Sequence, residues 1–325
     1  MSLDPTRLRR LRRTSALRAM VNETALRPTD LIMPIFAGAG GDRCEPLAAI
    51  PGVNLLAGAS LEREADAIVR AGVPAVLVFG VLDEGSKDAA ASEALRPGNA
   101  VCEAIGRIKN QRPELMVIAD LCLCEYTDHR HCGILREGRI DNDATVAVLA
   151  EAAVVLARAG ADIIAPSGVM DGVVAALRRA LDAAGLSDVA LMPYSAKFAS
   201  GFYGPFKAAS QSTPQESRHA THQIQVGNSR EALRKIAVDV EEGADLVIVK
   251  PALTSLDVLA LARDTVPVPL VGYDVSGFHA MLAHHCGTDA ALRRRLTCEL
   301  LTCIRRAGAK LIITYSAKDI APHLE

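Results

Sequence analysis

Residues 228–252, NSREALRKIAVDVEEGADLVIVKPA, decide the fold of this chain. The first part has the amphipathic pattern of a helix and closes on Gly-Ala at 243–244, which is typical of a helix C-terminus. The run DLVIVKPA at 245–252 follows at once and is apolar without alternation, as in strands buried on both faces. A helix that leads directly into such a strand predicts one unit of a repeating β/α fold.

The same unit recurs along the chain from residue 30 onward. Eight apolar runs alternate with helical stretches, at 31–38, 75–81, 115–123, 161–168, 189–197, 245–252, 268–277 and 310–317. Eight β/α units fit the usual size of a (β/α)8 barrel, about 250 residues or more. An open doubly wound sheet is the alternative, although no Gly-rich phosphate-binding turn follows the first run. We therefore predict an α/β protein with a (β/α)8 TIM barrel over residues 30–325.

Two segments depart from the repeat. Residues 1–29 carry a cluster of arginines around Leu8 and Leu11, namely Arg7, Arg9, Arg10, Arg12 and Arg13. Such a segment can bind nucleic acid, but the net charge of −2 argues against that partner, so we predict a basic arm that grips a neighbouring subunit. Residues 198–229 are too long for an ordinary β/α loop and are rich in Gly, Ser and Thr, which predicts an active-site lid.

Composition narrows the class of protein. Half of the 325 residues are hydrophobic, yet no apolar run approaches the roughly 18 residues that span a bilayer. The N-terminus has no apolar segment of the kind that directs secretion. Eight cysteines in a chain of this size and type are expected to be reduced thiols or metal ligands. We expect a cytoplasmic protein without a membrane partner.

Polar residues stand where the predicted strands end. Barrel enzymes build their sites at these C-terminal ends, which here carry Asp120, Cys122, Cys124, Ser167, Lys197, Lys250, Ser276 and Tyr315. A buried lysine has a lowered pKa, and its neutral amine attacks carbonyl groups to form an imine. One such lysine can instead hold a phosphate or a carboxylate. Two of them on successive strands, Lys197 and Lys250, favour carbonyl chemistry.

The stretch DLCLCEYTDHRHC (120–132) carries metal-binding chemistry. Its spacing C-x-C-x7-C supplies three thiolates, from Cys122, Cys124 and Cys132. Three protein ligands with one open position are typical of a catalytic zinc, whereas His129 or His131 as a fourth ligand would make a closed structural site. A redox switch is a third interpretation. Because soft thiolates select zinc over magnesium, we predict one zinc per subunit.

Several motifs together resemble the porphobilinogen synthase family, also called 5-aminolevulinate dehydratase. They are DLCLCEYTDHRHCG (120–133), DNDAT (141–145), APSGVMDG (165–172), YSAKFASGFYGPF (194–206) and VKPAL (249–253), and the similarity extends along nearly the whole chain. The resemblance implies a (β/α)8 barrel with an N-terminal arm, assembled as an octamer of arm-hugging dimers. It also implies an activity, the joining of two 5-aminolevulinate molecules into porphobilinogen with loss of two waters, in tetrapyrrole biosynthesis.

The resemblance also implies roles for individual residues. Lys250 would form an imine with the substrate that becomes the propionate half of the product, and Lys197 would form one with the other substrate. Cys122, Cys124 and Cys132 would hold a zinc that faces this second substrate. Ser276 and Tyr315 would bind the carboxylate of the first substrate. Further pocket positions are Asp120, Ser167, Tyr203 and Phe206.

Departures from the family pattern gather at the second substrate. Its carboxylate is usually held by two basic residues, typically arginines, and a glutamine, and these positions read Lys207, His219 and Gln223 here. Lysine lacks the planar two-point grip of arginine, and a histidine is largely neutral at pH 7. The sequence is therefore compatible with a synthase that has a weakened clamp, with a paralogue that condenses a different partner, or with a ligand-binding protein that has lost catalysis.

Other departures lie around the barrel. The family's APSDMMDGR becomes APSGVMDGV, and its YQVSGEY becomes YDVSGFH, which places Gly168, Val173, Asp274 and Phe278 where polar or charged residues usually stand. A glutamate in the helix after the lid commonly binds an allosteric magnesium, and Lys235 occupies that place. Because a cation there would repel the ion, we expect no allosteric magnesium.

Overall fold

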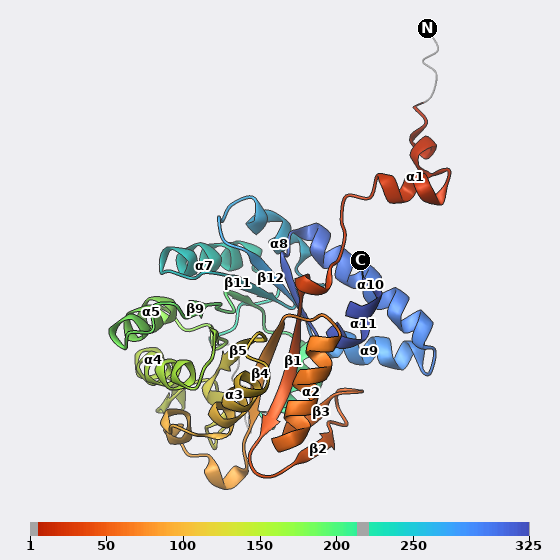
Figure 1. The fold of residues 1–325 in the computed structure, drawn as a ribbon. Coiled ribbons are helices and arrows are strands. Elements are labelled where there is room, and N and C mark those ends of the chain that lie inside the picture. Colours follow the sequence, from red (N-terminus) through yellow and green to blue (C-terminus); the bar gives the residue numbers. More distant parts are fainter. Residues whose placement is uncertain (1–5, 213–220, 325) are drawn as a thin grey trace.

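Eight parallel strand segments form the centre of the molecule, as predicted. A computed structural model describes residues 6–212 and 221–324. Figure 1 shows the strands gathered inside a layer of helices. In chain order the segments are β1 Leu31–Gly38, β4 Ala75–Val81, β5 Met116–Leu121, β8 Ile163–Pro166, β9 Ala190–Leu191 with β10 Ala196–Lys197, β11 Val247–Lys250, β12 Leu270–Asp274 and β13 Leu311–Thr314. Each pairs with the next, and β13 pairs with β1, so the (β/α)8 barrel is confirmed.

The fifth strand differs from the continuous strand predicted at 189–197. It is interrupted between β9 and β10 at Pro193, which has no N–H to donate to a neighbouring strand. Backbone bonds still close the barrel here, because the Met192 N–H donates to the Ile164 carbonyl at 2.9 Å and the Ile248 N–H donates to the Pro193 carbonyl at 2.9 Å. The barrel is therefore complete, with an irregular fifth strand.

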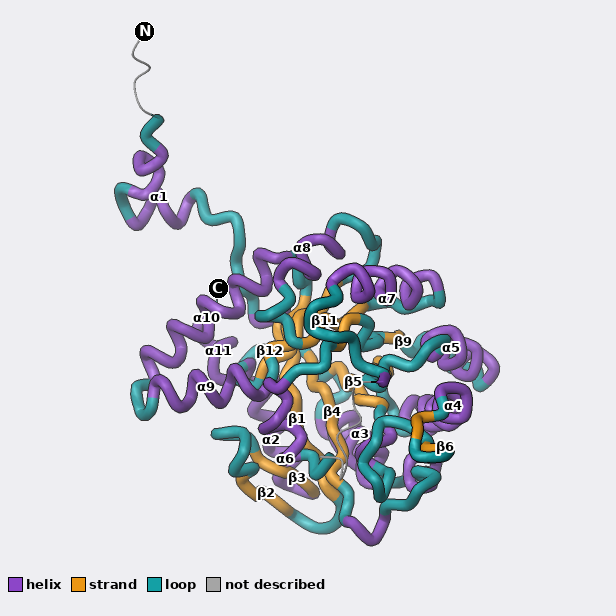
Figure 2. Tube along the Cα trace, turned by 180° about the vertical axis from the view of Figure 1, so that it is seen from behind, coloured by secondary structure: helices purple, strands orange, loops and turns teal. Residues whose placement is uncertain are grey.

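Helices cover the outside of the barrel (Figure 2). They are α2 Gly58–Arg70, α3 Ala100–Gln111, α4 Asn142–Arg158, α5 Val173–Ala183, α7 Ser229–Glu241, α8 Leu256–Arg263, α10 Ala290–Ala307 and α11 Ala317–Ile320, with two more, α6 Gly204–Ala209 and α9 Ser276–Cys286, at the carboxyl ends of the strands. Side chains such as Leu61, Ile68 and Ile105 are buried between helices and strands. Among the described residues, no helix has both the length and the hydropathy that crossing a bilayer would require.

Two hairpins were not predicted from the sequence. In the first, β2 Arg43–Pro46 pairs with β3 Asn54–Ala57, and β3 also pairs with β1. The second joins β6 Leu135–Arg136 to β7 Arg139–Ile140 through Glu137 and Gly138, whose φ angles are 51° and 72°. Two consecutive positive φ angles are those of a type I′ hairpin turn. Strands of two to four residues have too little pattern to be recognised from sequence.

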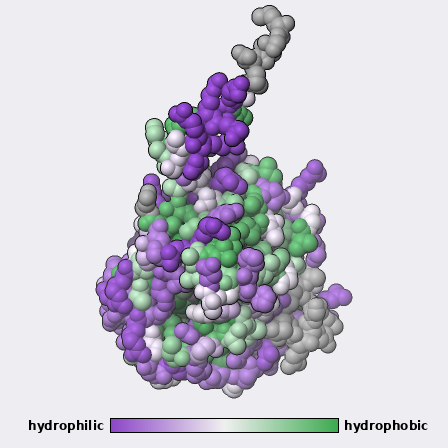
Figure 3. Space-filling view, turned by 90° about the vertical axis from the view of Figure 1, so that its right-hand side faces the viewer, coloured by the Kyte–Doolittle hydropathy of each residue, from purple (hydrophilic) through white to green (hydrophobic). Residues whose placement is uncertain are grey.

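The N-terminal arm stands away from the barrel (Figures 1 and 3). It contains a short 3-10 helix, Leu8–Arg12, and α1 Ser15–Met20. Leu8 is 73% exposed and Met20 is 80% exposed, and neither α1 nor the 3-10 helix contains a buried residue. The two helices of the arm therefore leave Leu8, Leu11 and Met20 exposed.

Candidate active site

Lys197 and Lys250 lie side by side at the carboxyl end of the barrel. They end β10 and β11, and their Cα atoms are direct partners in that parallel pair. Both side chains are buried, at 8% and 4% exposure. The Tyr194 ring lies beside both ammonium groups, 5.6 Å from Lys197 Nζ and 5.2 Å from Lys250 Nζ. The two predicted lysines therefore share one chamber.

Lys250 is surrounded by aromatic rings. Its Nζ lies 4.1 Å from the ring centre of Tyr273, 4.9 Å from that of Phe206 and 5.1 Å from that of Tyr203. The Tyr203 hydroxyl donates to the Lys250 carbonyl at 2.9 Å, which fixes the end of β11. Burial, together with the charge of Lys197, lowers the pKa of Lys250 to about 7. A substantial fraction of this amine is thus neutral near physiological pH.

Lys197 has polar and anionic neighbours. Its Nζ donates to the Ser167 carbonyl at 2.6 Å, and the Ser167 hydroxyl donates to Asp120 Oδ2 at 3.0 Å. Burial acts to lower the pKa of Lys197, yet the sulfurs of Cys132 and Cys122 and the carboxylate of Asp120 together raise it above its usual value. Burial and the Cys122 sulfur raise the pKa of Asp120 to about 7, against the opposing charges of the two lysines. Lys197 is therefore held as an ammonium group.

The three predicted cysteines converge next to Lys197. Cys122 and Cys124 flank the start of a 3-10 turn, Leu123–Glu125, directly after β5, and Cys132 returns to them from the following loop. Their sulfur atoms all lie within 4.8 Å of one another, and 3.1 Å separates Cys122 Sγ from Cys124 Sγ. Hydrogen bonds from the other two thiols hold the pKa of Cys132 well below its usual value. This donor set fits one metal ion that favours sulfur ligands.

No histidine of the described chain belongs to this thiol cluster, although His129 and His131 are on the same loop. Their rings lie beside each other, with centres 5.5 Å apart. Instead, a carboxylate supports the turn that carries the cysteines. Glu125 is buried and accepts the Gly80 N–H from β4 at 2.9 Å, which ties this turn to the neighbouring strand.

Ser276 and Tyr315 each contact a residue whose ring lies beside Lys250. Ser276 begins α9, and its Oγ accepts the N–H of Phe206 at 3.0 Å, which leaves its own O–H available to donate. Tyr315 follows β13, and its hydroxyl lies 3.3 Å from the Tyr273 hydroxyl. Both residues are buried. The structure thus brings two hydroxyl groups to the aromatic half of the site.

Residues of the predicted lid reach the same cavity. Lys207 and Gln223 line it together with both lysines, Cys124, Cys132, Tyr203, Phe206 and Ser212. Burial lowers the pKa of Lys207, and Gln223 is buried. His219 lies outside the described residues. Of the other predicted site residues, Cys122, Ser167 and Ser276 contact the lining directly, whereas Asp120 and Tyr315 reach it through Ser167 and Tyr273.

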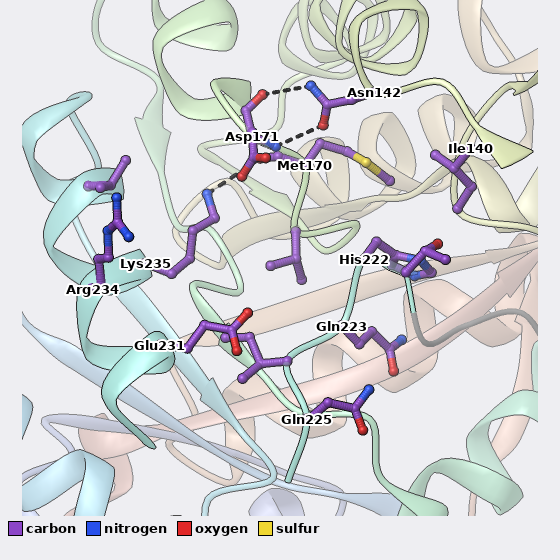
Figure 4. Close-up of a pocket in the computed structure, with 14 residues that line it drawn as sticks. Ile140, Asn142, Met170, Asp171, His222, Gln223, Gln225, Glu231, Arg234 and Lys235 are labelled. Carbon is purple, nitrogen blue, oxygen red and sulfur yellow. Dashed lines mark hydrogen bonds between the residues drawn. The ribbon is translucent and has the colours of Figure 1, made fainter. Parts of the chain in front are cut away.

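A second pocket adjoins the cavity and shares Gln223 with it (Figure 4). Lys235 reaches from α7 toward the loop after β8 and donates to the Met170 carbonyl at 3.4 Å. It also pairs with the buried carboxylate of Asp239, one helical turn later. The Lys235 ammonium group is therefore held by its own helix and by this loop.

Three site residues were missed by sequence reasoning. Tyr194 lies beside both lysines, Tyr273 is the ring nearest to Lys250 Nζ, and Ser212 is a buried hydroxyl in the cavity lining. A hydroxyl-bearing ring within an otherwise aliphatic buried strand was the available signal for both tyrosines, because a buried Tyr O–H needs a partner. Nothing in the sequence distinguishes Ser212 from its neighbours in a Ser-rich loop.

Comparison with known proteins identifies the family of this chain. The family model described as delta-aminolevulinic acid dehydratase matches residues 5–323. Curated relatives of that name include one from Halalkalibacterium halodurans, 47% identical over 97% of this chain and 95% of the relative, and one from Bacillus subtilis, 44% identical over 100% and 99%. A crystal structure of the Toxoplasma gondii ME49 enzyme with its reaction product porphobilinogen superposes with a TM-score of 0.95, at 38% identity, over 98% of this chain and 91% of that one. The chain belongs to the delta-aminolevulinic acid dehydratase family.

Proposed function

We propose that the protein is a porphobilinogen synthase, a dehydratase that joins two 5-aminolevulinate molecules into porphobilinogen and releases two waters. This reaction belongs to tetrapyrrole biosynthesis. The observation that carries the proposal is the pair of buried lysines in register on β10 and β11, which lie in contrasting electrostatic surroundings. Two imine-forming amines in one chamber match a reaction that combines two ketones.

Lys250 binds the first substrate. Its neutral amine attacks the ketone carbon, and the ketone oxygen leaves as water when the imine forms. Aromatic rings around the amine exclude solvent, which favours the imine over its hydrolysis. The hydroxyl groups of Ser276 and Tyr315 donate to the carboxylate of this substrate. Asp120, with a pKa of about 7, can hold or release a proton near neutrality.

Lys197 binds the second substrate. Its amine must lose a proton before it attacks a ketone, and the Ser167 carbonyl and Asp120 are the groups that surround it. Lys207, His219 and Gln223 hold the carboxylate of this substrate. A single lysine provides a weaker grip than paired arginines, because it binds a carboxylate as a point charge.

Cys122, Cys124 and Cys132 would hold one zinc ion on the side of the second substrate. Zinc bound there supplies Lewis acidity, which polarises a carbonyl oxygen or lowers the pKa of an amine. The thiol cluster lies next to Lys197, because the sulfurs of Cys132 and Cys122 are the neighbours that raise the pKa of that lysine most. An open position in a three-thiolate set is typical of catalytic zinc.

Residues 198–229 act as the lid of the chamber. The segment carries Lys207 and Gln223 to the cavity, and the N–H of Phe206 donates to Ser276 on the barrel. Closure over bound substrate would slow amide hydrogen exchange in this segment. Equal exchange with and without 5-aminolevulinate would contradict a lid.

The arm is proposed to hold a neighbouring subunit, in a homo-oligomer that is an octamer of arm-hugging dimers in the cytoplasm. Four exposed apolar side chains of the arm support this proposal, because a neighbouring subunit would bury them: Leu8, Leu11, Met20 and Val21. Removing residues 1–29 should reduce the number of subunits per particle, which light scattering measures. An unchanged number of subunits would contradict the role of the arm.

A direct assay tests the activity. Purified protein loaded with zinc and supplied with 5-aminolevulinate should yield a pyrrole, detected with Ehrlich reagent. Imine formation without pyrrole would favour the second candidate, a paralogue that condenses an amino-ketone with a different partner. The changed carboxylate clamp, Lys207 with His219, is the observation that favours that candidate. A chain that forms neither imine nor pyrrole would be a binding protein that has lost catalysis.

A further inference from the structure

We propose that Asp274 and His279 are paired positioning residues that fix Ser276 and Tyr315 relative to each other. The inference rests on the proposed function, in which these two hydroxyl groups bind the carboxylate of the first substrate. Ser276 lies between Asp274 and His279 in the sequence and is the first residue of α9, directly after β12. Tyr315 lies between Thr314 and Ser316, just after β13.

Two side-chain bonds join these segments, and each involves one of the two neighbours of Tyr315. The Thr314 hydroxyl donates to Asp274 Oδ2 at 2.8 Å. Ser316 Oγ lies 3.3 Å from His279 Nδ1. Tyr315 belongs to the apolar cluster inside the barrel, and its two neighbours are Thr314, the last residue of β13, and Ser316, in the turn before α11. Fixing both neighbours therefore fixes the direction of the Tyr315 ring.

The bonds form one continuous chain of buried groups. The Ser316 N–H donates to Thr314 Oγ1 at 3.2 Å, which links the two contacts to each other. The His279 ring also packs against the Tyr315 ring, with centres 5.6 Å apart. Asp274, His279, Thr314 and Ser316 are all buried, so solvent does not compete for these bonds.

The protonation of His279 follows from its partners. Nε2 lies 2.8 Å from the Pro51 carbonyl, an acceptor, and 3.1 Å from the Arg293 guanidinium, a donor, and we assign the hydrogen to Nε2 because the carbonyl contact is the shorter one. Nδ1 of the neutral ring then accepts the Ser316 hydroxyl. The charge of the Arg293 guanidinium disfavours a second proton on the ring. Burial, together with this arginine, lowers the pKa of His279, which keeps Nδ1 available as an acceptor.

Asp274 and His279, the two positioning residues, occur in the motif YDVSGFH, at the positions where the family motif reads Gln and Tyr. These two differences from the family motif act together, because each of the two side chains bonds a residue next to Tyr315. Neither side chain lines the cavity described above, so their action on substrate is indirect.

Matched substitutions test this inference in the zinc-loaded, full-length protein. The amide oxygen of His279→Asn can replace Nδ1 and keep the bond to Ser316, whereas His279→Gln keeps a donor for Pro51 and loses Ser316. Asp274→Asn retains an acceptor for Thr314, and Asp274→Ala does not. The measurement is the concentration of 5-aminolevulinate that gives half-maximal borohydride trapping on Lys250, followed by intact mass, with KM and kcat alongside.

Losing one such bond should raise the half-saturating concentration roughly tenfold in His279→Gln, Ser316→Ala and Asp274→Ala. His279→Asn and Asp274→Asn should stay within about twofold of wild type. Because His279 and Ser316 share one bond, the double variant His279→Gln/Ser316→Ala should be no worse than either single variant. The kcat at saturating substrate should change less than KM.

Equal half-saturation in His279→Asn and His279→Gln would overturn the inference, as would variants that lower only the melting temperature. Ser316→Ala removes one hydroxyl and provides the same comparison if a histidine variant does not fold. A wild-type protein that traps no adduct on Lys250 would instead overturn the proposed function. Trapping by wild type that no variant weakens would overturn the positioning role alone.

Discussion

The two lysines of the chamber are both buried, but their pKa values are shifted in opposite directions. Lys250 and Lys197 are partners on adjacent strands, and each is less than a tenth exposed. Around Lys250 the nearest groups are aromatic rings, and burial lowers its pKa to about 7. Around Lys197 the groups that act on its charge are three sulfurs and a carboxylate, which raise its pKa despite burial.

This difference assigns an order to the two substrates. Burial alone would make both amines neutral, because it disfavours the charged form of any lysine. The anionic neighbours cancel that effect on one side only. An amine that is already neutral captures a ketone first, while the other remains an ammonium group that attracts a carboxylate-bearing substrate. We therefore infer that the first substrate molecule binds at Lys250, the lysine that is surrounded by aromatic rings.

The largest expected effect comes from removing either amine. Lys250→Ala should abolish borohydride trapping and lower turnover by at least about 10⁴-fold, because the covalent intermediate is lost. Lys197→Ala should stop condensation to a similar degree and still trap substrate on Lys250. Lys310→Ala, at an exposed lysine before β13, is the control that should retain both activities. Equal loss of trapping in both active-site variants would remove the distinction between the two sides.

Metal removal should affect one side of the chamber. A chelator that strips zinc should leave almost no pyrrole formation, while trapping on Lys250 persists, because the thiols lie beside Lys197. Far-UV circular dichroism should show a barrel that remains folded without metal. Global unfolding on chelation would instead identify a structural zinc.

Strengthening the residues that hold the carboxylate of the second substrate should produce a moderate gain in porphobilinogen formation. Lys207→Arg combined with His219→Arg restores two planar guanidinium groups, and each charge-assisted bond contributes about 1.5–3 kcal/mol. Porphobilinogen formation at limiting substrate should rise by about one to two powers of ten. The half-saturating concentration for Lys250 trapping should not change, which is the internal control. No gain in pyrrole with intact trapping would favour the paralogue.

Replacing Lys250 by methionine should stabilise the fold in a pH-dependent manner. The folded protein has a pKa of about 7 at this lysine and the unfolded chain has the usual value of 10.5, so the folded state is penalised fully below pH 7. The penalty disappears as pH rises from about 7 to 10.5. Lys250→Met should therefore raise the melting temperature by at least about 2–4 °C at pH 6 and by less at pH 9.5.

The exposed Lys310→Met variant provides the matched control for this experiment, with a small change that does not depend on pH. A stabilisation by Lys250→Met that is equal at both pH values would mean that the Lys250 pKa is not lowered. A destabilised variant at pH 6 would contradict the aromatic, low-polarity character of this side of the chamber.

Magnesium should have the smallest effect. Lys235, held by Asp239 and the Met170 carbonyl, places a cation where the resemblance to the family predicts a site for this ion. Millimolar Mg²⁺ added to the zinc-loaded protein should leave both turnover and oligomer mass unchanged. Saturable activation by Mg²⁺ would contradict this expectation.

Much of this architecture follows from local sequence. Continuous apolar runs located the strands, and the lysines that end two successive runs are direct partners in the barrel. The C-x-C-x7-C spacing correctly placed three sulfurs together. These features depend on short-range pattern and on the rule that parallel strands end at one edge.

Other features depend on contacts between distant segments. Tyr194 lies beside Lys250, 56 residues later, and the bonds from Asp274 to Thr314 and from His279 to Ser316 join positions 40 and 37 residues apart. The opposite pKa shifts of the two lysines likewise arise from neighbours contributed by other strands. Sequence reasoning predicted that burial lowers the pKa of a lysine and had no means to say which of the two lysines keeps a neutral amine.

The central claim is that Lys250 captures substrate before Lys197, and site-resolved trapping tests it most directly. Less than one equivalent of 5-aminolevulinate is reduced with borohydride across a range of pH, and the modified lysine is identified by peptide mass spectrometry. The account predicts an adduct on Lys250 that becomes half-maximal near pH 7, with Lys197 unlabelled at this ratio. An adduct that forms first on Lys197, or a Lys250 midpoint near the ordinary lysine value of 10.5, would contradict it.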